Sequence, residues 1–266
     1  MTTRLPDGAG RPVIGGVVPS PRTIAPALTG PLAGRSALVA GASQGIGSAV
    51  AEALARAGAR VVLVARRPGP LVEAADRCGI AGHVLTADLA EPTAPRRVVE
   101  ELRRRGERID LLVYSAGEYL RGAWADTPAG ALDYQLALTA RAPYELVQRL
   151  LPDLRGGGDV VLLVSTVRPA AGLGAYAAAH AALRSLARTL RAEVSGMDLR
   201  VLEVRPGRTA TPRQRRVFEE EGRLDGYHPE LLLQPEDVAS VVLSCVQLPR
   251  RAEVTEVELR PSVRSY

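Results

Sequence analysis

A glycine-rich turn between two short apolar runs contains the residues of this sequence best suited to bind a ligand. The turn lies between the runs 36–40 and 60–64 and contains Gly41, Ser43, Gln44, Gly45, Ile46 and Gly47. Gly41 lets the chain turn sharply, Gly45 lets the backbone approach a phosphate, and Gly47 lets the following helix pack closely on the sheet. Free N–H groups and the dipole at the start of that helix favour an anion. This placement predicts a diphosphate site, although glycines alone are a weak indication.

The turn belongs to a regular alternation of strand-like and helix-like segments. Short apolar runs predict strands at 36–40, 60–64, 83–86, 110–114, 159–164, 199–204 and 254–259. Helices are expected between them at 46–57, 68–77, 95–105, 129–151, 175–195 and 235–247. The alternation predicts an α/β fold, a Rossmann-like, doubly wound parallel sheet of about seven strands flanked by helices in a single domain. Ligands of such sheets bind beyond the carboxyl ends of the strands.

Residues 1–33 differ in composition from the rest of the chain. Six of the 20 prolines lie within the first 31 residues, among glycines and small polar residues. This composition is typical of an extended, Pro/Gly-rich N-terminal arm, and we expect the domain itself over 34–266. A mobile tail is the preferred interpretation, and an arm lying across a partner subunit is the alternative.

Composition and charge limit the classes of function. A chain of 266 residues with 46% hydrophobic content can bury a full core. The net charge of +5 comes from arginines spread along the chain, so we expect no nucleic-acid partner. No segment resembles a signal peptide or a membrane span, and Cys78 and Cys245 lie far apart, so we expect a cytoplasmic protein with no membrane partner. The three histidines lack metal-ligand spacing, so no metal site is expected.

Several motifs occur in an order that resembles the short-chain dehydrogenase/reductase family. The glycine-rich turn is followed by Asp88 with Leu89, by Ser115, Ala116 and Gly117, by Tyr176, and by Pro206 and Gly207 with Thr209 and Thr211. The resemblance covers about residue 34 to the C-terminus and implies a pyridine dinucleotide cofactor. By this resemblance Asp88 binds the adenine amino group, the segment 115–117 supports the adenine-ribose side, and the segment 206–211 flanks the nicotinamide.

The end of the second strand indicates which cofactor is used. Members of the family that bind NAD hold the ribose hydroxyls there with an acidic residue. In this chain the position is Ala65, followed by Arg66 and Arg67. A missing carboxylate and two guanidinium groups favour a 2′-phosphate. We therefore expect NADP(H), the alternative being that both arginines are ordinary surface residues.

The catalytic residues that the resemblance implies are only partly present. The family uses a tyrosine as proton donor, a serine that orients the carbonyl, an asparagine that holds a water, and a lysine that binds ribose and lowers the pKa of the tyrosine. Tyr176 is present, whereas the lysine position is His180 and the asparagine position is Thr139. Thr166 aligns best with the serine, and Ser165 is the alternative.

The change from lysine to His180 weakens one part of this chemistry. Histidine, with an unperturbed pKa of about 6.5, is mostly neutral at pH 7 and supplies little positive charge. Ketone reduction suffers less than alcohol oxidation, because a neutral tyrosine is already the acid required. By the resemblance His180 would contact the ribose and Tyr176, and a residue that merely fills space is the open alternative.

We therefore expect an enzyme, an NADP(H)-dependent oxidoreductase that reduces a small carbonyl substrate by hydride transfer with Tyr176 as proton donor. The alternatives are a catalytically degenerate dinucleotide-binding protein and an enzyme that reuses the fold for a non-redox step such as dehydration or rearrangement. A homodimer or homotetramer follows from the resemblance, since the family pairs helices equivalent to 129–151 and 175–195 across a two-fold axis.

Charged residues near the expected site leave the substrate open. Arg168, Arg205 and Arg208 border the site and could receive an acidic substrate, although solvated arginines are commoner. The charged stretch 213–223 lies where the family places its substrate lid, and a mobile, partly helical flap is expected there.

Overall fold

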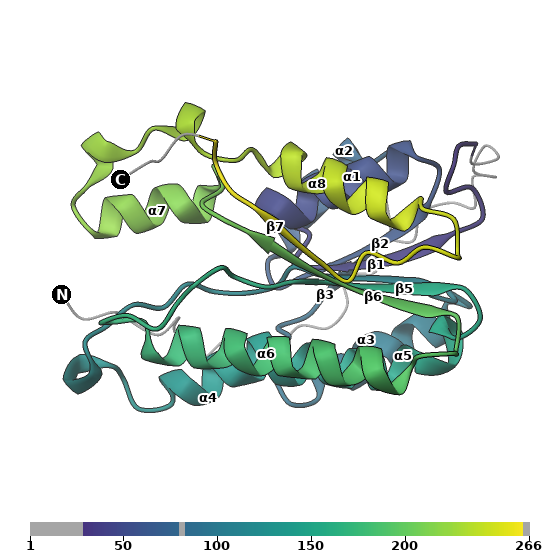
Figure 1. Ribbon diagram of the computed structural model, residues 1–266, viewed down its shortest axis with the longest axis horizontal. Helices are drawn as coiled ribbons and strands as arrows, with labels where there is room; N and C mark the ends of the chain where they lie inside the picture. Colours follow the sequence, from purple (N-terminus) through teal and green to yellow (C-terminus); the bar gives the residue numbers. More distant parts are fainter. Residues whose placement is uncertain (1–28, 80–82, 263–266) are drawn as a thin grey trace.

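The protein folds into one parallel sheet with helices on both faces (Figure 1). The computed structural model describes residues 29–79 and 83–262, so most of the predicted arm 1–33 lies outside the described residues. The last residues of that arm pack onto the domain, because Leu32 is buried and its N–H donates to the carbonyl of Ala57 at 2.9 Å.

The sheet has seven strands, as the alternation predicts, and their order is β3-β2-β1-β4-β5-β6-β7. They are β1 (Ser36–Ala40), β2 (Arg60–Ala65), β3 (Val84–Thr86), β4 (Leu111–Tyr114), β5 (Gly158–Leu163), β6 (Leu199–Pro206) and β7 (Glu256–Leu259). All neighbouring pairs are parallel. The strand order reverses between β1 and β4, so the connections after these strands leave on opposite faces and a crevice forms at their carboxyl ends.

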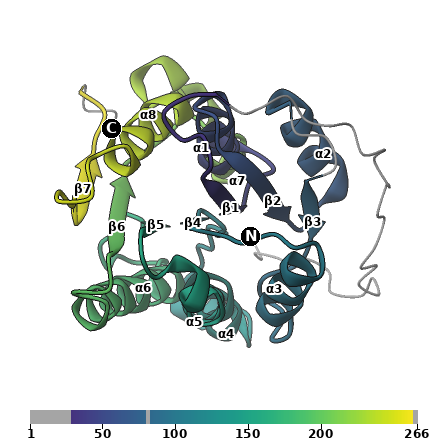
Figure 2. The ribbon, with the colours of Figure 1, turned by 90° about the vertical axis from the view of Figure 1, so that its right-hand side faces the viewer.

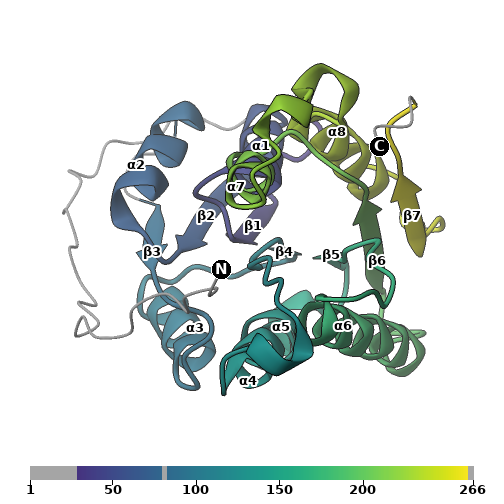
Figure 3. The same cartoon turned by 90° about the vertical axis from the view of Figure 1, so that its left-hand side faces the viewer.

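Two layers of helices cover the sheet (Figures 2 and 3). One layer contains α1 (Gly45–Arg56), α2 (Pro68–Arg77) and α8 (Pro235–Val246), and the other contains α3 (Ala94–Arg104), α5 (Ala142–Leu154) and α6 (Gly174–Glu193). Successive β1 residues alternate between the two cores, with Leu38 and Ala40 in one cluster and Ala37 and Val39 in the other. No helix among the described residues is both long and apolar enough to cross a membrane.

The helix expected over 129–151 is interrupted. A short helix α4 (Ala131–Leu136) passes into a π-helical segment, η2 (Ala137–Arg141), before α5 begins. A π turn accommodates an extra residue between the two helices, and such turns are frequent at functional sites. Thr139 lies in this segment.

The charged stretch after β6 forms a further helix, α7 (Pro212–Glu220), beyond the carboxyl ends of the strands (Figure 1). The hydroxyl of Thr211 accepts a hydrogen bond from the N–H of Gln214 at 3.1 Å, and Pro212 follows at the first helical position. The described residues also form three short 3₁₀ turns, which are η1 (Trp124–Asp126), η3 (Leu224–Gly226) and η4 (Pro229–Leu231).

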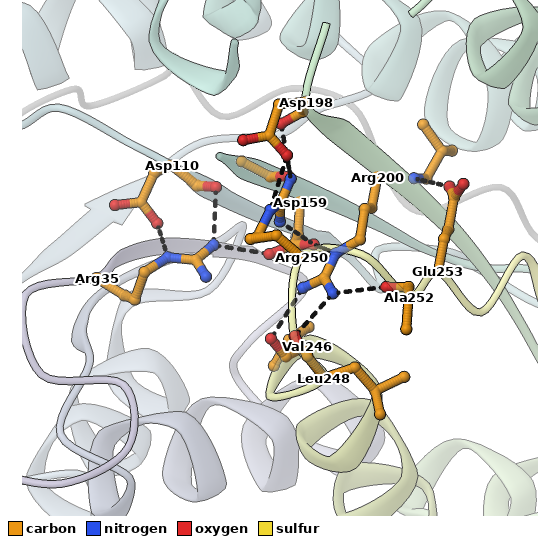
Figure 4. A network of polar contacts seen from close by, with 12 residues as sticks. Arg35, Asp110, Asp159, Asp198, Arg200, Val246, Leu248, Arg250, Ala252 and Glu253 are labelled. Carbon is orange, nitrogen blue, oxygen red and sulfur yellow. Dashed lines mark hydrogen bonds and ion pairs between the residues drawn. The ribbon is translucent and has the colours of Figure 1, made fainter. Parts of the chain in front are cut away.

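At the opposite end of the sheet, Asp159 joins three arginines (Figure 4). The residue is 3% exposed, and its carboxylate accepts from Arg35 Nη2 at 2.8 Å, Arg200 Nε at 2.6 Å and Arg250 Nη1 at 3.2 Å. Arg35 also bonds Asp110. The other N–H groups of Arg200 donate to the carbonyls of Val246, Leu248 and Ala252. The network therefore ties β5 and β6 to the segments that precede β1 and follow α8.

Replacing Asp159 with asparagine would remove the negative charge at nearly constant volume. We expect Asp159→Asn to lower the free energy of unfolding by about 3–5 kcal/mol, because the buried guanidinium of Arg200 loses its counter-ion. Urea denaturation measures this change. Asp153, whose carboxylate lies 3.8 Å from the exposed Arg108, is the matched control. Asp153→Asn should cost less than about 1 kcal/mol. Equal losses in the two variants would contradict the structural role of the network.

Candidate active site

The glycine-rich turn joins β1 to α1 through a very close approach of backbone. Gly41 and Gly45 have φ angles of +83° and +58°, in the left-handed region that favours glycine. A Cβ atom on Gly41 would lie 2.5 Å from the amide nitrogen of Ala116, and one on Gly47 would lie 2.2 Å from the carbonyl oxygen of Gly41. Only glycine fits at these two positions without a shift of the backbone.

Helix α1 begins without a side-chain cap. Its N-cap residue, Gln44, makes no capping hydrogen bond, and the first turn contains no acidic residue. The side-chain oxygen of Gln44 instead accepts from Arg67 Nη2 at 3.0 Å. By contrast, α8 begins with a capping box made by Gln234 and Asp237. The N–H groups of the first turn of α1 are therefore left for water or an anionic ligand.

A cavity of about 200 Å³, here named the turn cavity, opens over this turn. The predicted cofactor-binding residues that line it are Gly41, Ser43, Gln44, Gly45, Ile46, Arg66, Arg67, Asp88, Leu89, Ser115, Ala116, Gly117 and Thr211. Gly47 is buried beneath the turn. Sequence reasoning missed Glu118, Tyr134 and Arg216, which also line the cavity.

The predicted phosphate-binding arginines lie at the rim of the turn cavity. Arg66 Nη1 is 3.4 Å from the hydroxyl of Tyr134 and 3.8 Å from the carboxylate of Asp88, and Arg66 Nη2 is 3.8 Å from that of Glu118. The second carboxylate oxygen of Asp88 accepts from the N–H of Ala90 at 3.0 Å. The side chain of Arg66 remains 42% exposed, so its guanidinium is accessible to a ligand.

A second cavity of about 410 Å³, here named the tyrosine cavity, adjoins the first. Its volume suits a small-molecule ligand. The predicted residues that line it, besides some shared with the turn cavity, are Ser165, Thr166, Tyr176, His180, Pro206, Gly207 and Thr209. The structure thus brings the predicted tyrosine, histidine and hydroxyl groups together beside the glycine-rich turn.

Tyr176 and His180 lie on successive turns of α6, and their ring centroids are 4.5 Å apart in an edge-to-face arrangement. His180 Nδ1 accepts a hydrogen bond from the backbone N–H of Ser165 at 3.1 Å. Burial, aided by the positive charge of Arg213, lowers the pKa of His180 to about 4. The imidazole is therefore neutral at neutral pH and carries its proton on Nε2. A lysine could not accept the Ser165 N–H, so His180 holds the end of β5 as well as filling space.

Two neighbouring hydroxyl groups follow β5, and they differ in their contacts. The hydroxyl oxygen of Ser165 accepts from the N–H of Val167 at 3.1 Å. The hydroxyl of Thr166 has no hydrogen-bond partner within the described part of the chain. Both residues line the tyrosine cavity. Thr166 is therefore the freer of the two to bind a ligand oxygen.

Thr139, predicted to replace the asparagine, lies outside both cavities. It is 1% exposed, and its hydroxyl has no hydrogen-bond partner among residues 29–79 and 83–262. The π-helical segment that carries it packs against α6. No cluster of three or more His, Cys, Asp or Glu residues in these ranges is arranged to hold a metal ion.

The chain has no lysine, so all 34 of its basic residues are arginines. One of them, Arg213, lines both cavities. Its Nη1 donates to the carbonyl of Gly117 at 3.1 Å, and its charge acts on His180. Arg213 thus places a permanent positive charge where the two cavities meet.

Sequence reasoning missed several other residues of the tyrosine cavity. They come from the loop after β4 and from α7 and the turn that follows, namely Tyr119, Arg121, Phe218, Glu221 and Arg223. The charged stretch 213–223 and the position of 119–121 just beyond a predicted strand end are the signals that could have found them.

Comparison with known proteins identifies the family. Residues 35–222 match the family model described as short chain dehydrogenase. The rhamnolipids biosynthesis 3-oxoacyl-[acyl-carrier-protein] reductase of Pseudomonas aeruginosa is 30% identical over 228 residues, which cover 80% of this chain and 89% of that protein. The glycine betaine reductase ATRR of Emericella nidulans is 30% identical over 90% of this chain, but the chain spans only 20% of that protein.

A solved structure of L-sorbose reductase from Gluconobacter frateurii, complexed with NADPH and L-sorbose, is also similar. Its TM-score is 0.77 at 27% identity, over 87% of this chain and 95% of that one. The chain therefore belongs to the short-chain dehydrogenase/reductase family.

The lowered pKa of His180 predicts a dependence of stability on pH. The unfolded chain takes up a proton near the ordinary value of 6.5, whereas the folded chain does so only near 4, so acidification favours the unfolded state. Stability from this group is complete above the unfolded value and falls as the pH drops toward the folded one. Between about pH 7.5 and about pH 5 we expect a loss of about 2 kcal/mol.

His180→Gln should remove this part of the pH dependence, because an amide oxygen can accept the Ser165 N–H without titrating. The measurement is urea denaturation at both pH values. His228→Gln, at the exposed position just before η4, is the matched control and should retain the loss. An unchanged slope in His180→Gln would contradict the assignment.

Proposed function

We propose that this protein is an NADP(H)-dependent oxidoreductase that reduces a small carbonyl compound. The observation that carries the proposal is the uncapped, glycine-lined start of α1 beside a cavity that contains Tyr176. The names of the relatives support it, because they include a 3-oxoacyl-[acyl-carrier-protein] reductase and an L-sorbose reductase complexed with NADPH. These names favour reduction over a non-redox step or a purely binding role.

The residues of the turn cavity fit a pyridine dinucleotide. Backbone N–H groups at the start of α1 would hold the diphosphate, while Gly41 and Gly47 allow the close backbone packing that forms this turn. Arg66 and Arg67 would hold a 2′-phosphate as paired guanidinium groups, and Asp88 would bind the adenine. Pro206, Gly207, Thr209 and Thr211 would flank the nicotinamide, which supplies the hydride when bound.

The proton in the proposed reaction comes from the hydroxyl of Tyr176. Thr166 would donate a hydrogen bond to the substrate oxygen, because its hydroxyl has no partner among the described residues, and Ser165, whose hydroxyl accepts from Val167, remains the alternative. His180, through Nε2–H, would bind a ribose hydroxyl and support the Tyr176 ring. Because the imidazole carries no charge, Arg213 is the residue proposed to supply positive charge at the junction of the cavities. Thr139, in the π-helical segment, is proposed to take the place of the asparagine.

We also propose a reducing, cytoplasmic setting and a homodimer or homotetramer. Cys78 and Cys245 are free, burial raises the pKa of the Cys78 thiol to about 11, and burial also raises the pKa of Cys245. Such thiols are poorly reactive. Exposed apolar side chains on α4 and α5, Leu132 and Tyr144, support pairing through these helices.

Cofactor preference is tested with Arg66→Gln and Arg67→Gln. We expect each variant to weaken NADPH binding about 10- to 100-fold and to leave NADH binding nearly unchanged, because a charge-assisted bond to phosphate is lost. Isothermal titration calorimetry gives both affinities. Arg56→Gln at the exposed end of α1 is the matched control. A wild-type protein that binds NADH as tightly as NADPH would contradict the preference.

The proposed role of Tyr176 as proton donor is tested with Tyr176→Phe. We expect NADPH-dependent reduction of a panel of aldehydes and ketones to fall at least about 100-fold, because general acid catalysis is lost, while NADPH binding persists. The rate of NADPH oxidation is the measurement. Tyr144→Phe, a change on α5 outside both cavities, should retain the wild-type rate. Full activity in Tyr176→Phe would rule out this mechanism.

A further inference from the structure

We propose that the substrate carries an anionic group, a carboxylate or a phosphate, bound by arginines on the wall of the tyrosine cavity. The location of the reacting carbonyl at Tyr176 rests on the proposed function, whereas the anion site follows from the charges of the cavity itself.

Arginines dominate the charged lining of the tyrosine cavity. Of the described residues that line it, five are arginines and one, Glu221, is a carboxylate. Arg213 also lines the turn cavity, where a cofactor phosphate could balance it. The other arginines line the tyrosine cavity alone, and they are Arg121, Arg168, Arg208 and Arg223. Their charge is therefore not accounted for by the cofactor.

Glu221 offsets only part of this charge. It accepts hydrogen bonds from Arg121 and from Arg223 Nη1, the latter at 3.1 Å, so one carboxylate serves two guanidinium groups. The lining as a whole keeps an excess of positive charge. A cavity with walls of one sign raises the local concentration of ions of the opposite sign.

A neighbouring arginine shows the opposite arrangement. Arg205, one of the arginines expected to border the site, lines neither cavity. It lies 3.7, 3.4 and 3.5 Å from the carboxylates of Glu203, Glu256 and Glu258 on β6 and β7. Three carboxylates thus surround Arg205, whereas the described residues that line the tyrosine cavity include one carboxylate for five arginines.

Phe218, the single phenylalanine of the chain, contacts two of the cavity arginines through its ring. The guanidinium carbon of Arg208 lies 5.9 Å from the ring centroid, and that of Arg223 lies 5.4 Å from it. The ring is 5% exposed and packs against Tyr227 at 5.4 Å between centroids. Attraction to the ring offsets part of the repulsion between the two cations. Each contact with the ring holds a guanidinium group at the cavity wall, where it can bind an oxygen of a carboxylate or phosphate.

Tyr119 lies beside Tyr176 and interacts electrostatically with two of the cavity arginines. Its ring centroid is 5.1 Å from that of Tyr176. Burial raises the pKa of Tyr119, and the charges of Arg121 and Arg208 oppose this rise, which places both arginines within electrostatic range of its hydroxyl. Because Tyr176, Tyr119 and these arginines line one cavity, a substrate with its carbonyl at Tyr176 can present an acidic end to the arginines.

The experiment compares carbonyl compounds that differ only in charge. Keto acids of increasing chain length are paired with their methyl esters, and dihydroxyacetone phosphate is paired with dihydroxyacetone. Calorimetry measures binding to the protein loaded with NADP⁺, and NADPH oxidation measures turnover. We expect the best anionic compound to bind at least about tenfold more tightly than its neutral partner, and the preferred pair distinguishes carboxylate from phosphate.

Arg208→Gln and Arg168→Gln test the residues. Each should reduce binding of the anionic compound about tenfold and leave its neutral partner unchanged, and Arg208→Lys should recover part of the loss because it restores charge without the planar fork. Arg168 is exposed, so its variant is informative even where Arg208→Gln fails to fold. Arg96→Gln, an equal change of charge on the outer face of α3, should retain the wild-type preference.

The outcomes separate this inference from the proposed function. Equal binding of charged and neutral partners, or no binding of any anionic compound, overturns the anion site, while reduction of the neutral compounds would keep the reductase. Arginine-dependent binding of an anion without NADPH oxidation by any compound supports the anion site and contradicts the reductase.

Discussion

The close approach of the backbone of Gly41 to that of Ala116 is the constraint on which the site depends. It lies where the strand order reverses between β1 and β4, and it leaves no room for a side chain. Ile46 and the segment 115–117 line both cavities, so the same contact positions the start of α1 and the floor beside Tyr176. A displacement here would change the turn cavity and the tyrosine cavity together, because the two cavities share these residues.

The fold could be predicted wherever one local pattern decides an element. The apolar run 36–40 and the segment 68–77 have the bounds of β1 and α2, because a buried parallel strand is continuously apolar and Pro68 suits the first position of a helix. The interruption at Ala137–Arg141 could not be predicted. A π turn inserts one residue between two helical segments, and the apolar pattern on either side continues through it.

The residues of the candidate site likewise fall into those that a local sequence pattern predicts and those that it does not. Spacing within a few residues identifies the glycine-rich turn, Arg66 and Arg67, and the pair of Tyr176 and His180. Contacts between distant segments leave no local pattern in the sequence. For example, the hydrogen bond between Arg121 and Glu221 joins residues one hundred positions apart. The charged stretch 213–223 is typical of a solvated surface, yet its fold directs Arg213 and Arg223 to cavity walls. The neutrality of His180 likewise depends on burial, which its sequence neighbours do not specify.

The absence of lysine has a consequence for how this cavity could be controlled. Arginine keeps its proton at every pH at which a protein of this kind is folded. Acetylation and other acyl modifications act on lysine amines, and no side chain of this chain offers one. The positive character of the tyrosine cavity is therefore permanent. Neither a shift in cellular acidity nor acyl transfer to a side chain can neutralise it.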